Sequence, residues 1–123
     1  MFPLQVTPLH LAVWFKSSAA VVSALIQAGA NVDALDTDQY SPLHHASKWN
    51  PAVVPVLIGA GCKVNLLDVL KLSPLYYAAR WSKDQSAVAA LMSAGADPHL
   101  GNSPLTDSSV SKGMKDFIRS LSK

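Results

Sequence analysis

The sequence contains a single cysteine, no glutamate and few charged residues of either sign. Because Cys62 has no second cysteine to pair with, an intrachain disulfide is excluded, and we expect a reducing compartment, cytoplasmic or nuclear. The 10 lysines and arginines and 8 aspartates leave a formal net charge of +2. That excess is too small to predict binding to nucleic acid or to an anionic membrane.

Long hydrophobic runs are also missing. The longest stretch without a charged residue, Ser17 to Val32, contains serines, a glutamine and an asparagine, so it is too polar and too short to span a bilayer. The opening Met1 to Leu4 has no basic segment of the kind that begins a signal peptide. Half of the residues are hydrophobic and only 15% are charged, which argues against disorder. We therefore expect one soluble domain over residues 1–123.

The chain does contain an internal repeat. Residues 41–65 hold a Ser-Pro-Leu-His start, a Val-x-x-Leu segment and a closing glycine, and the same order recurs along the chain. Repeats start at Thr7, Ser41, Ser73 and, in degenerate form, Ser103, so the periods are 34, 32 and 30 residues. Periods of this length indicate a solenoid, in which each unit buries its apolar face against its neighbours.

Each copy carries its own helix start and stop signals. The hydroxyl residue at the start can cap a first helix, and the proline after it occupies a position that needs no hydrogen bond. A glycine then follows the second helix, where a left-handed residue is favoured. The predicted N-caps are Thr7, Ser41, Ser73 and Ser103, and the predicted C-terminal glycines are Gly29, Gly61 and Gly95.

These motifs resemble the ankyrin repeat, whose pattern is Thr-Pro-Leu-His-x-Ala-Ala, a Val-x-x-Leu-Leu helix and Gly-Ala-Asp-Val-Asn. The resemblance implies an all-α solenoid of stacked helix–turn–helix units joined by β-turn fingers. We place the repeats at about residues 4–35, 36–67, 68–98 and 99–123. It also implies recognition of a protein or peptide on a concave face without catalysis, and a local hydrogen-bonding role for His10 and His44 that braces neighbouring repeats.

Several positions depart from that pattern. Gln39 and Lys71 stand where a finger glycine with positive φ is normal. Pro55 is expected to kink the second helix of repeat two, predicted at about Ala52–Ala60. The fourth repeat ends in a predicted helix with one apolar stripe, formed by Val110, Met114, Phe117, Ile118 and Leu121. The apolar opening residues favour a segment excised from a longer protein.

The sequence does not indicate a catalytic site or a metal site. The serines lack a Gly-x-Ser-x-Gly elbow, and no glycine-rich phosphate loop follows a strand pattern. The histidines and Cys62 show no metal-ligand spacing, and His44 and His45 point about 100° apart on a helix. We expect no enzyme activity, no cofactor and no metal.

The informative pattern lies at the ends of the first helices. Two residues there end the helix in each repeat: Trp14 and Phe15, Lys48 and Trp49, Arg80 and Trp81. The second member is aromatic each time, so stacking predicts a ladder of rings across the concave face. The alternative is that the rings fold back as packing. A partner's lysine held between Trp49 and Trp81 is a further possibility.

We predict recognition of a protein or peptide on an aromatic, weakly basic concave surface. An acidic residue of the ligand is expected to meet Lys48 or Arg80. The predicted binding residues are Phe15, Tyr40, Lys48, Trp49, Val69, Leu70, Leu72, Arg80 and Trp81. The alternative is a scaffold segment of a larger ankyrin protein, or a regulatory subunit, docked through a neutral convex face, since the predicted second helices carry no charge.

Overall fold

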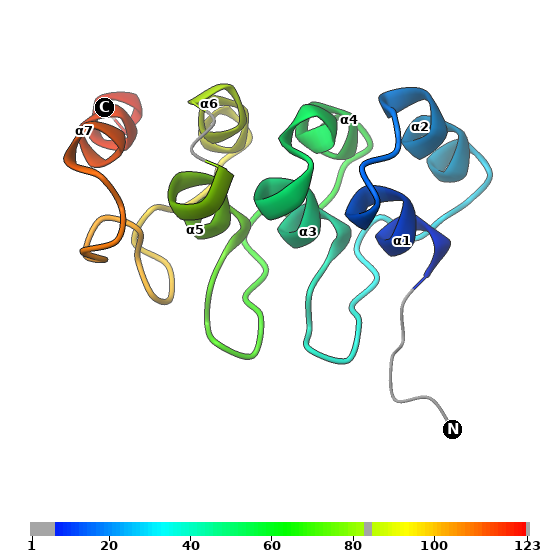
Figure 1. Ribbon diagram of the computed structural model, residues 1–123, viewed down its shortest axis with the longest axis horizontal. Helices are drawn as coiled ribbons and strands as arrows, with labels where there is room; N and C mark the ends of the chain where they lie inside the picture. The colour runs from blue at the N-terminus through cyan, green and yellow to red at the C-terminus, as the bar shows by residue number, and fades with distance from the viewer. Residues whose placement is uncertain (1–6, 83–84, 123) are drawn as a thin grey trace.

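The computed structural model describes residues 7–82 and 85–122 as a stack of paired helices. Helices of one layer lie beside the fingers, and the others form a second layer above them (Figure 1). The first layer holds α1 (Pro8–Trp14), α3 (Pro42–Trp49), α5 (Pro74–Tyr77) and the π-helical turn η2 (Ala78–Ser82). The second holds α2 (Ala19–Gln27), α4 (Val54–Gly59), α6 (Gln85–Ser93) and, at the C-terminal end, α7 (Lys112–Leu121).

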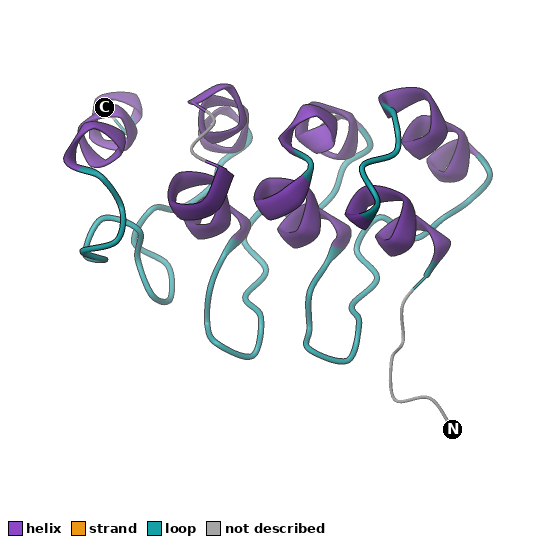
Figure 2. Ribbon diagram, in the orientation of Figure 1, coloured by secondary structure: helices purple, strands orange, loops and turns teal. Residues whose placement is uncertain are grey.

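All regular structure in those described ranges is helical (Figure 2). Within the first layer, α1 packs on α3 and α3 packs on α5; within the second, α4 packs on α6 and α6 on α7. The all-α class and the stacked arrangement predicted from the repeat are confirmed.

Capping residues begin the first helices as predicted in three of the four repeats. The hydroxyl oxygens of Thr7, Ser41 and Ser73 accept hydrogen bonds from the backbone N–H three residues later. In the first two repeats the histidine at that third position returns the bond, because its Nδ1 accepts from the backbone N–H of the cap residue. These reciprocal bonds pair donors that a helix start would otherwise leave unpaired.

The prediction of an N-cap at Ser103 is wrong. Residues 104–106 form a turn and not a helix. The Ser103 hydroxyl accepts from the N–H of Leu105 within this turn and donates to the carbonyl of Pro98. Asp107 follows at once, and its carboxylate accepts from the N–H of Ser109 at 2.7 Å. Such local bonds offer the backbone an alternative to a helix.

The second helix of repeat two also differs from the prediction of one kinked helix over Ala52–Ala60. A 3₁₀ turn, η1 (Pro51–Val53), comes first, and α4 begins only at Val54. Pro55 therefore lies in the first turn of α4, where its missing N–H costs no helical hydrogen bond. The chain breaks the helix upstream of Pro55 rather than bending it there.

Two aspartates organise the fingers. Asp36 Oδ1 accepts from the backbone N–H of Asp38 and Tyr40, and Asp68 Oδ1 accepts from the N–H of Leu70 and Leu72. The residue before the end of each finger has positive φ, 64° at Gln39 and 61° at Lys71, as the glycine position predicted. Lys16, at φ 59°, takes the same conformation after α1, which the sequence had not indicated.

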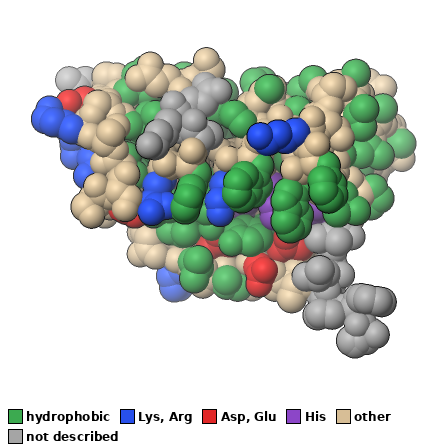
Figure 3. Space-filling model, in the orientation of Figure 1, with side chains coloured by type: hydrophobic (Ala, Val, Ile, Leu, Met, Phe, Trp, Pro, Cys, Tyr) green, Lys and Arg blue, Asp and Glu red, His purple; other side chains and the backbone are tan. Residues whose placement is uncertain are grey.

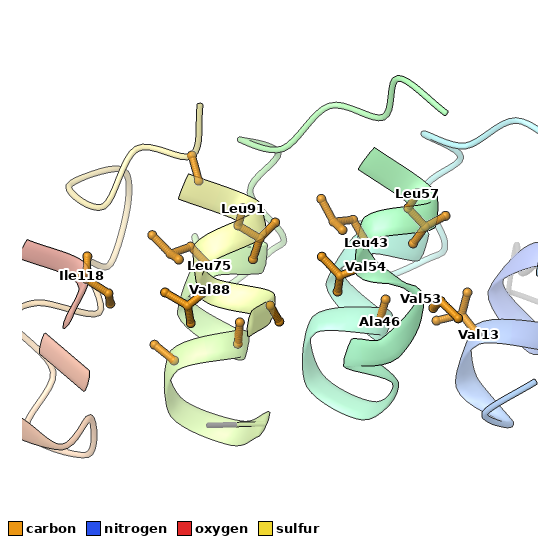
Figure 4. Packing of buried hydrophobic residues seen from close by; sticks show 14 of the residues in the cluster. Val13, Leu43, Ala46, Val53, Val54, Leu57, Leu75, Val88, Leu91 and Ile118 are labelled. Carbon is orange, nitrogen blue, oxygen red and sulfur yellow. The ribbon is translucent and has the colours of Figure 1, made fainter. Parts of the chain in front are cut away.

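A continuous apolar core runs between the two helical layers. Leu9, Leu43 and Leu75, which share one position of the repeat, are fully buried. Figure 4 shows Leu43 and Leu75 with Val54, Val88 and Ile118 in this core. The predicted stripe of the last helix is largely confirmed: Val110, Met114 and Ile118 are buried and Phe117 is half-buried, although Val110 precedes the helix and Leu121 is 39% exposed.

Histidines join the repeats to one another, as the resemblance implied. His10 Nε2 donates to the carbonyl of Tyr40, and His44 Nε2 donates to the carbonyl of Leu72, each at 3.0 Å. Both carbonyls belong to the residue just before the N-cap of the next repeat's first helix. In repeat three Tyr76 takes the histidine position and its longer side chain reaches the Asp107 carboxylate instead.

Candidate functional site

The aromatic residues at the ends of the first helices face solvent. We call these aromatic residues, together with the cations Lys48 and Arg80 that precede two of them, the aromatic row: Trp14, Phe15, Lys48, Trp49, Arg80 and Trp81. Trp14 is the last residue of α1, Trp49 the last of α3, and Trp81 lies in η2. The rings are exposed by 46% at Trp14, 75% at Phe15, 42% at Trp49 and 48% at Trp81. They are therefore only partly packed.

The space-filling view shows how this face is composed (Figure 3). Hydrophobic and basic side chains alternate in a row above the fingers, with histidine among them, and acidic side chains gather below the row. The alternation arises because α1 and its C-cap supply two aromatic residues, while α3 and η2 each place a cation directly before one aromatic residue.

Lys48 occupies the centre of the row. Its ammonium lies 4.8 Å from the ring centroid of Trp49, 4.6 Å from that of Trp81 and 5.6 Å from that of Tyr77. Arg80 lies 4.2 Å from the ring of Trp81. A cation over an aromatic face is stabilised by the negative potential of the ring. The place between Trp49 and Trp81, where a partner's lysine had been envisaged, thus holds the chain's own Lys48.

A hollow of about 180 Å³ opens in the same face. It lies between α1, α3, α5 and the finger that ends at Tyr40. Its walls are mostly aromatic, with one ammonium and two imidazoles. The lining residues are Trp14, Tyr40, His44, His45, Lys48, Trp49 and Tyr77.

Asp36 anchors His45 in the wall of this hollow. His45 Nε2 donates to Asp36 Oδ2 at 3.0 Å, and both side chains are buried. Trp14 stacks on the imidazole with ring centroids 5.5 Å apart and planes within 11°. Burial lowers the pKa of His45, and the hydrogen bond and charge of Asp36 only partly offset that effect.

The next repeat makes the same contact with a different side chain. Tyr77 replaces His45, and its hydroxyl donates to Asp68 Oδ2. Burial and this hydrogen bond raise the pKa of the phenol, which stays neutral at physiological pH. In both repeats the aspartate precedes its partner by nine residues, so the equal spacing was the signal that could have revealed these pairs. Sequence reasoning missed Asp36, His45 and Tyr77 as site residues.

The structure separates the predicted binding residues into two groups. Tyr40, Lys48 and Trp49 line the hollow, and Trp81 and Arg80 adjoin it through Lys48. Phe15 continues the row beyond Trp14, with ring centroids 6.3 Å apart. By contrast, Val69 and Leu70 lie on the second finger, 55% and 58% exposed, Leu72 is half-buried, and none of these three lines the hollow.

One histidine cluster has the composition of a metal site. Ligand atoms of His10, Asp36 and His45 lie within 4.8 Å of one another. The hydrogen bonds already described account for this grouping. His10 uses Nδ1 to accept from Thr7 and Nε2 to donate to Tyr40, and His45 Nε2 bonds Asp36. His10 Nε2 and His45 Nε2 thus brace the first finger through Tyr40 and Asp36.

Across the described ranges 7–82 and 85–122, no helix has the length and apolar character needed to cross a bilayer.

Comparison with known proteins identifies the same repeat. A family model described as ankyrin repeats, in three copies, matches residues 3–68, slightly more than half of the chain. This segment includes α1 to α4 and the two aspartates that organise the fingers, Asp36 and Asp68. No curated protein matches the chain.

Proposed function

The chain belongs to the ankyrin-repeat family, and from this premise we propose that it is a non-catalytic module that binds a protein or peptide along the aromatic row. Ankyrin repeats in general are protein-interaction modules. The observation that carries the proposal is the exposure of large rings, from 42% to 75%, in one continuous row beside a hollow. Exposed aromatic residues gathered on one face are typical of an interaction site.

The composition of the row favours an apolar ligand with some negative charge. Tryptophan and arginine are the residue types that most often dominate binding energy. Burying a large apolar side chain that was fully exposed contributes about 1.5–3 kcal/mol through the hydrophobic effect. An extended segment that crosses three repeats can contact Phe15, Trp49 and Trp81 in turn. The exposed finger residues Val69 and Leu70 provide a further apolar contact below the row.

The rest of the proposal concerns context. We infer a single domain over residues 1–123, with repeats at about 4–35, 36–67, 68–98 and 99–123, within a larger protein or complex. We expect no enzyme activity, no nucleic acid or membrane as partner, and a cytoplasmic or nuclear location. The small net charge of the chain, +2, supports the expectation about nucleic acid and membrane, and the single cysteine supports the expected location.

Selection of peptides tests the proposal. A random peptide library is displayed and selected against the folded domain, and the peptides retained are assayed for binding by fluorescence anisotropy. We expect Trp49→Ala and Trp81→Ala each to weaken binding at least tenfold, corresponding to about 1.4 kcal/mol. Val21→Ala in α2 is the control, because Val21 is 46% exposed in the other helical layer.

The control variant is expected to bind as the unchanged domain does. If selected peptides lose affinity with Val21→Ala but not with the two tryptophan variants, the aromatic row is not the binding surface and the proposal fails. Thermal unfolding of each variant shows that any loss of binding occurs in folded protein.

A second candidate function rests on the outer helices. Helices α2, α4 and α6 contain no lysine, arginine, aspartate or glutamate. We infer, as the alternative, a scaffold segment or regulatory subunit held by this neutral convex face. Binding that is lost with Val21→Ala in the assay above supports this alternative.

A further inference from the structure

Lys48 carries a positive charge that no acidic side chain neutralises in the described part of the chain. The ion pairs there join His45 to Asp36 and Asp116 to Lys112 and Arg119. Lys48 instead lies over Trp49, Trp81 and Tyr77. The rings hold the ammonium at the edge of the hollow, with donors available for an incoming acceptor.

His45 can supply a second donor in the same hollow when its imidazole is protonated. Its Nε2 is bonded to Asp36, while no described residue bonds its Nδ1. The His45 ring lines the hollow. Its Nδ1 is not fully enclosed, because Ser47 Oγ is the one fully enclosed unpaired side-chain atom among the described residues. Asp36 fixes the orientation of the imidazole, as a carboxylate does in other Asp–His pairs.

We propose that the hollow between Tyr40, His45 and Lys48 binds the carboxylate of an aspartate or glutamate side chain of the partner. This inference rests on the proposed function and specifies part of it. The ammonium of Lys48 and protonated Nδ1 of His45 donate to the two carboxylate oxygens, and the rings of Tyr40 and Trp49 cover the aliphatic part of the side chain. Charge-assisted bonds in a partly desolvated site are strong.

The position of the hollow favours a side chain over a chain terminus. The aromatic row extends beyond the hollow on both sides, to Phe15 in one direction and to Trp81 and Arg80 in the other. A segment that uses the whole row must pass the hollow in mid-chain. It then offers a side-chain carboxylate there, whereas a C-terminal carboxylate would leave half of the row uncovered.

Binding is expected to take up a proton at His45. In the free protein, burial lowers the pKa of this imidazole, and the charges of His10 and Lys48 lower it further, while Asp36 raises it. The phenol of Tyr40 also contacts the ring, with centroids 5.1 Å apart, and His44 and Tyr77 are the other titratable groups that line the hollow. A carboxylate at Nδ1 raises the pKa, so affinity increases as pH falls, by at most about tenfold per unit between the free and bound pKa values.

Two small probes test this subsite without requiring a partner peptide. One is glutamate blocked as its N-acetyl N-methylamide, and the other is glutamine blocked in the same way. NMR titration follows the indole N–H signal of Trp49 and the ring signals of His45. We expect blocked glutamate to shift both saturably, with higher affinity at pH 6 than at pH 8, and to raise the pKa of His45. Blocked glutamine is expected to bind at least tenfold more weakly.

Variants at Lys48 separate charge recognition from structure. Lys48→Met is expected to lose at least tenfold in affinity for blocked glutamate, and Lys48→Arg to retain most of it because the cation stays over the rings. Lys63→Met is the matched control, since Lys63 is exposed and does not line the hollow. Equal shifts by the two probes, no saturable shift, or equal affinity at the two pH values would overturn the proposal.

The outcomes also distinguish this inference from the proposed function. If selected peptides need Trp49 and Trp81 yet bind equally well after every acidic residue is changed to its amide, the row binds peptide and the carboxylate subsite is wrong. If blocked glutamate binds as expected but no peptide depends on the row, the subsite stands and the proposed function fails.

Discussion

At the scale of single residues, Gly101 is the most constrained position of the short third finger, residues 99–102. Its φ is +60°, a value that favours glycine. A Cβ added there would lie 2.4 Å from the carbonyl oxygen of Lys71 and 3.0 Å from Leu67 Cδ2. The next residue, Asn102, donates through its backbone N–H to the same Lys71 carbonyl at 2.9 Å. Close approach of two backbones therefore requires glycine here.

Gly101→Ala is expected to lower the free energy of unfolding by about 2 kcal/mol or more, because it combines an unfavourable φ with a backbone clash. Urea denaturation measures the change. Gly113→Ala is the matched control: Gly113 lies in α7 with nothing within 4 Å of an added Cβ, and alanine favours a helix by about 0.5 kcal/mol or more. A Gly101 variant as stable as the unchanged protein would contradict the close contact.

The buried histidines should make stability depend on pH. Burial is the largest cause that lowers the pKa of both His44 and His45 from the ordinary value of 6.5. Between the folded and unfolded pKa values, the unfolded chain binds more protons, so acidification favours unfolding. We expect the free energy of unfolding to fall as pH drops below about 6.5.

Urea titrations between about pH 7.5 and pH 5.5 measure this slope, which spans the ordinary histidine pKa. His45→Gln should reduce the slope because it removes a group whose pKa burial lowers, whatever its effect on absolute stability. His99→Gln, at an exposed position, should leave the slope unchanged. A slope identical in all three proteins would show that His45 does not contribute.

At the scale of elements, α7 closes the C-terminal end of the stack. It begins at Lys112, capped by the hydroxyl of Ser111, which accepts from the N–H of Met114 at 3.1 Å. Lys112 pairs with Asp116 one turn later at 2.8 Å, on the exposed side. Ile118 is fully buried against the core, whereas Leu121 at the last turn is 39% exposed. The helix thus packs on the stack through only a few of its residues.

Ile118→Ala should lower the free energy of unfolding by about 2–4 kcal/mol, because it removes a buried side chain and leaves a cavity. Leu121→Ala should cost less than about 1 kcal/mol, because that side chain is already partly in water. Urea denaturation of the two variants provides the comparison. Similar losses for both would mean that α7 does not pack on α6 as the structure shows.

The π-helical turn η2 illustrates how an element can aim a side chain. It follows the single α-helical turn of α5 and spans Ala78 to Ser82, and Trp81 lies within it. Turns of this kind are rare and occur often at functional sites. Trp81 reaches the ammonium of Lys48 from the neighbouring repeat, at 4.6 Å from the ring centroid. The π-helical turn thus carries the tryptophan that contacts Lys48.

At the scale of the whole molecule, the aromatic row is the feature that stacking creates. All three tryptophans of the chain belong to it, and each is between 42% and 48% exposed. Each repeat contributes only two residues to the row, so the face exists only once repeats lie side by side. Lys48 joins two repeats by lying over rings from both.

Tryptophan fluorescence reports on this arrangement without a ligand. We expect emission shifted to the red and efficient quenching by acrylamide, because every indole is partly in water. Trp49→Phe and Trp81→Phe should each remove part of the quenchable signal and lower stability by less than about 1 kcal/mol. Blue-shifted, protected emission with a large loss of stability would place the rings in a core.

The candidate site was partly accessible to sequence reasoning. The positions of Phe15, Trp49 and Trp81 follow from the repeat period, and Lys48 and Arg80 precede two of these rings in sequence. Asp36 and His45 were missed because their contact joins a finger to the following helix, although the same nine-residue spacing recurs at Asp68 and Tyr77. Val69, Leu70 and Leu72 were predicted with the row, but the finger carries them away from the hollow.

The sequence by itself determined the features that local chemistry and periodicity control. Hydroxyl residues before proline start three helices, glycines end the second helices, and leucines at one repeat position form the core. Only the tertiary structure decided the break before Pro55, the turn after Ser103, the π-helical turn at Trp81 and the position of Lys48 over its rings. Those outcomes depend on side-chain rotamers and on distances between repeats, which a one-dimensional pattern does not contain.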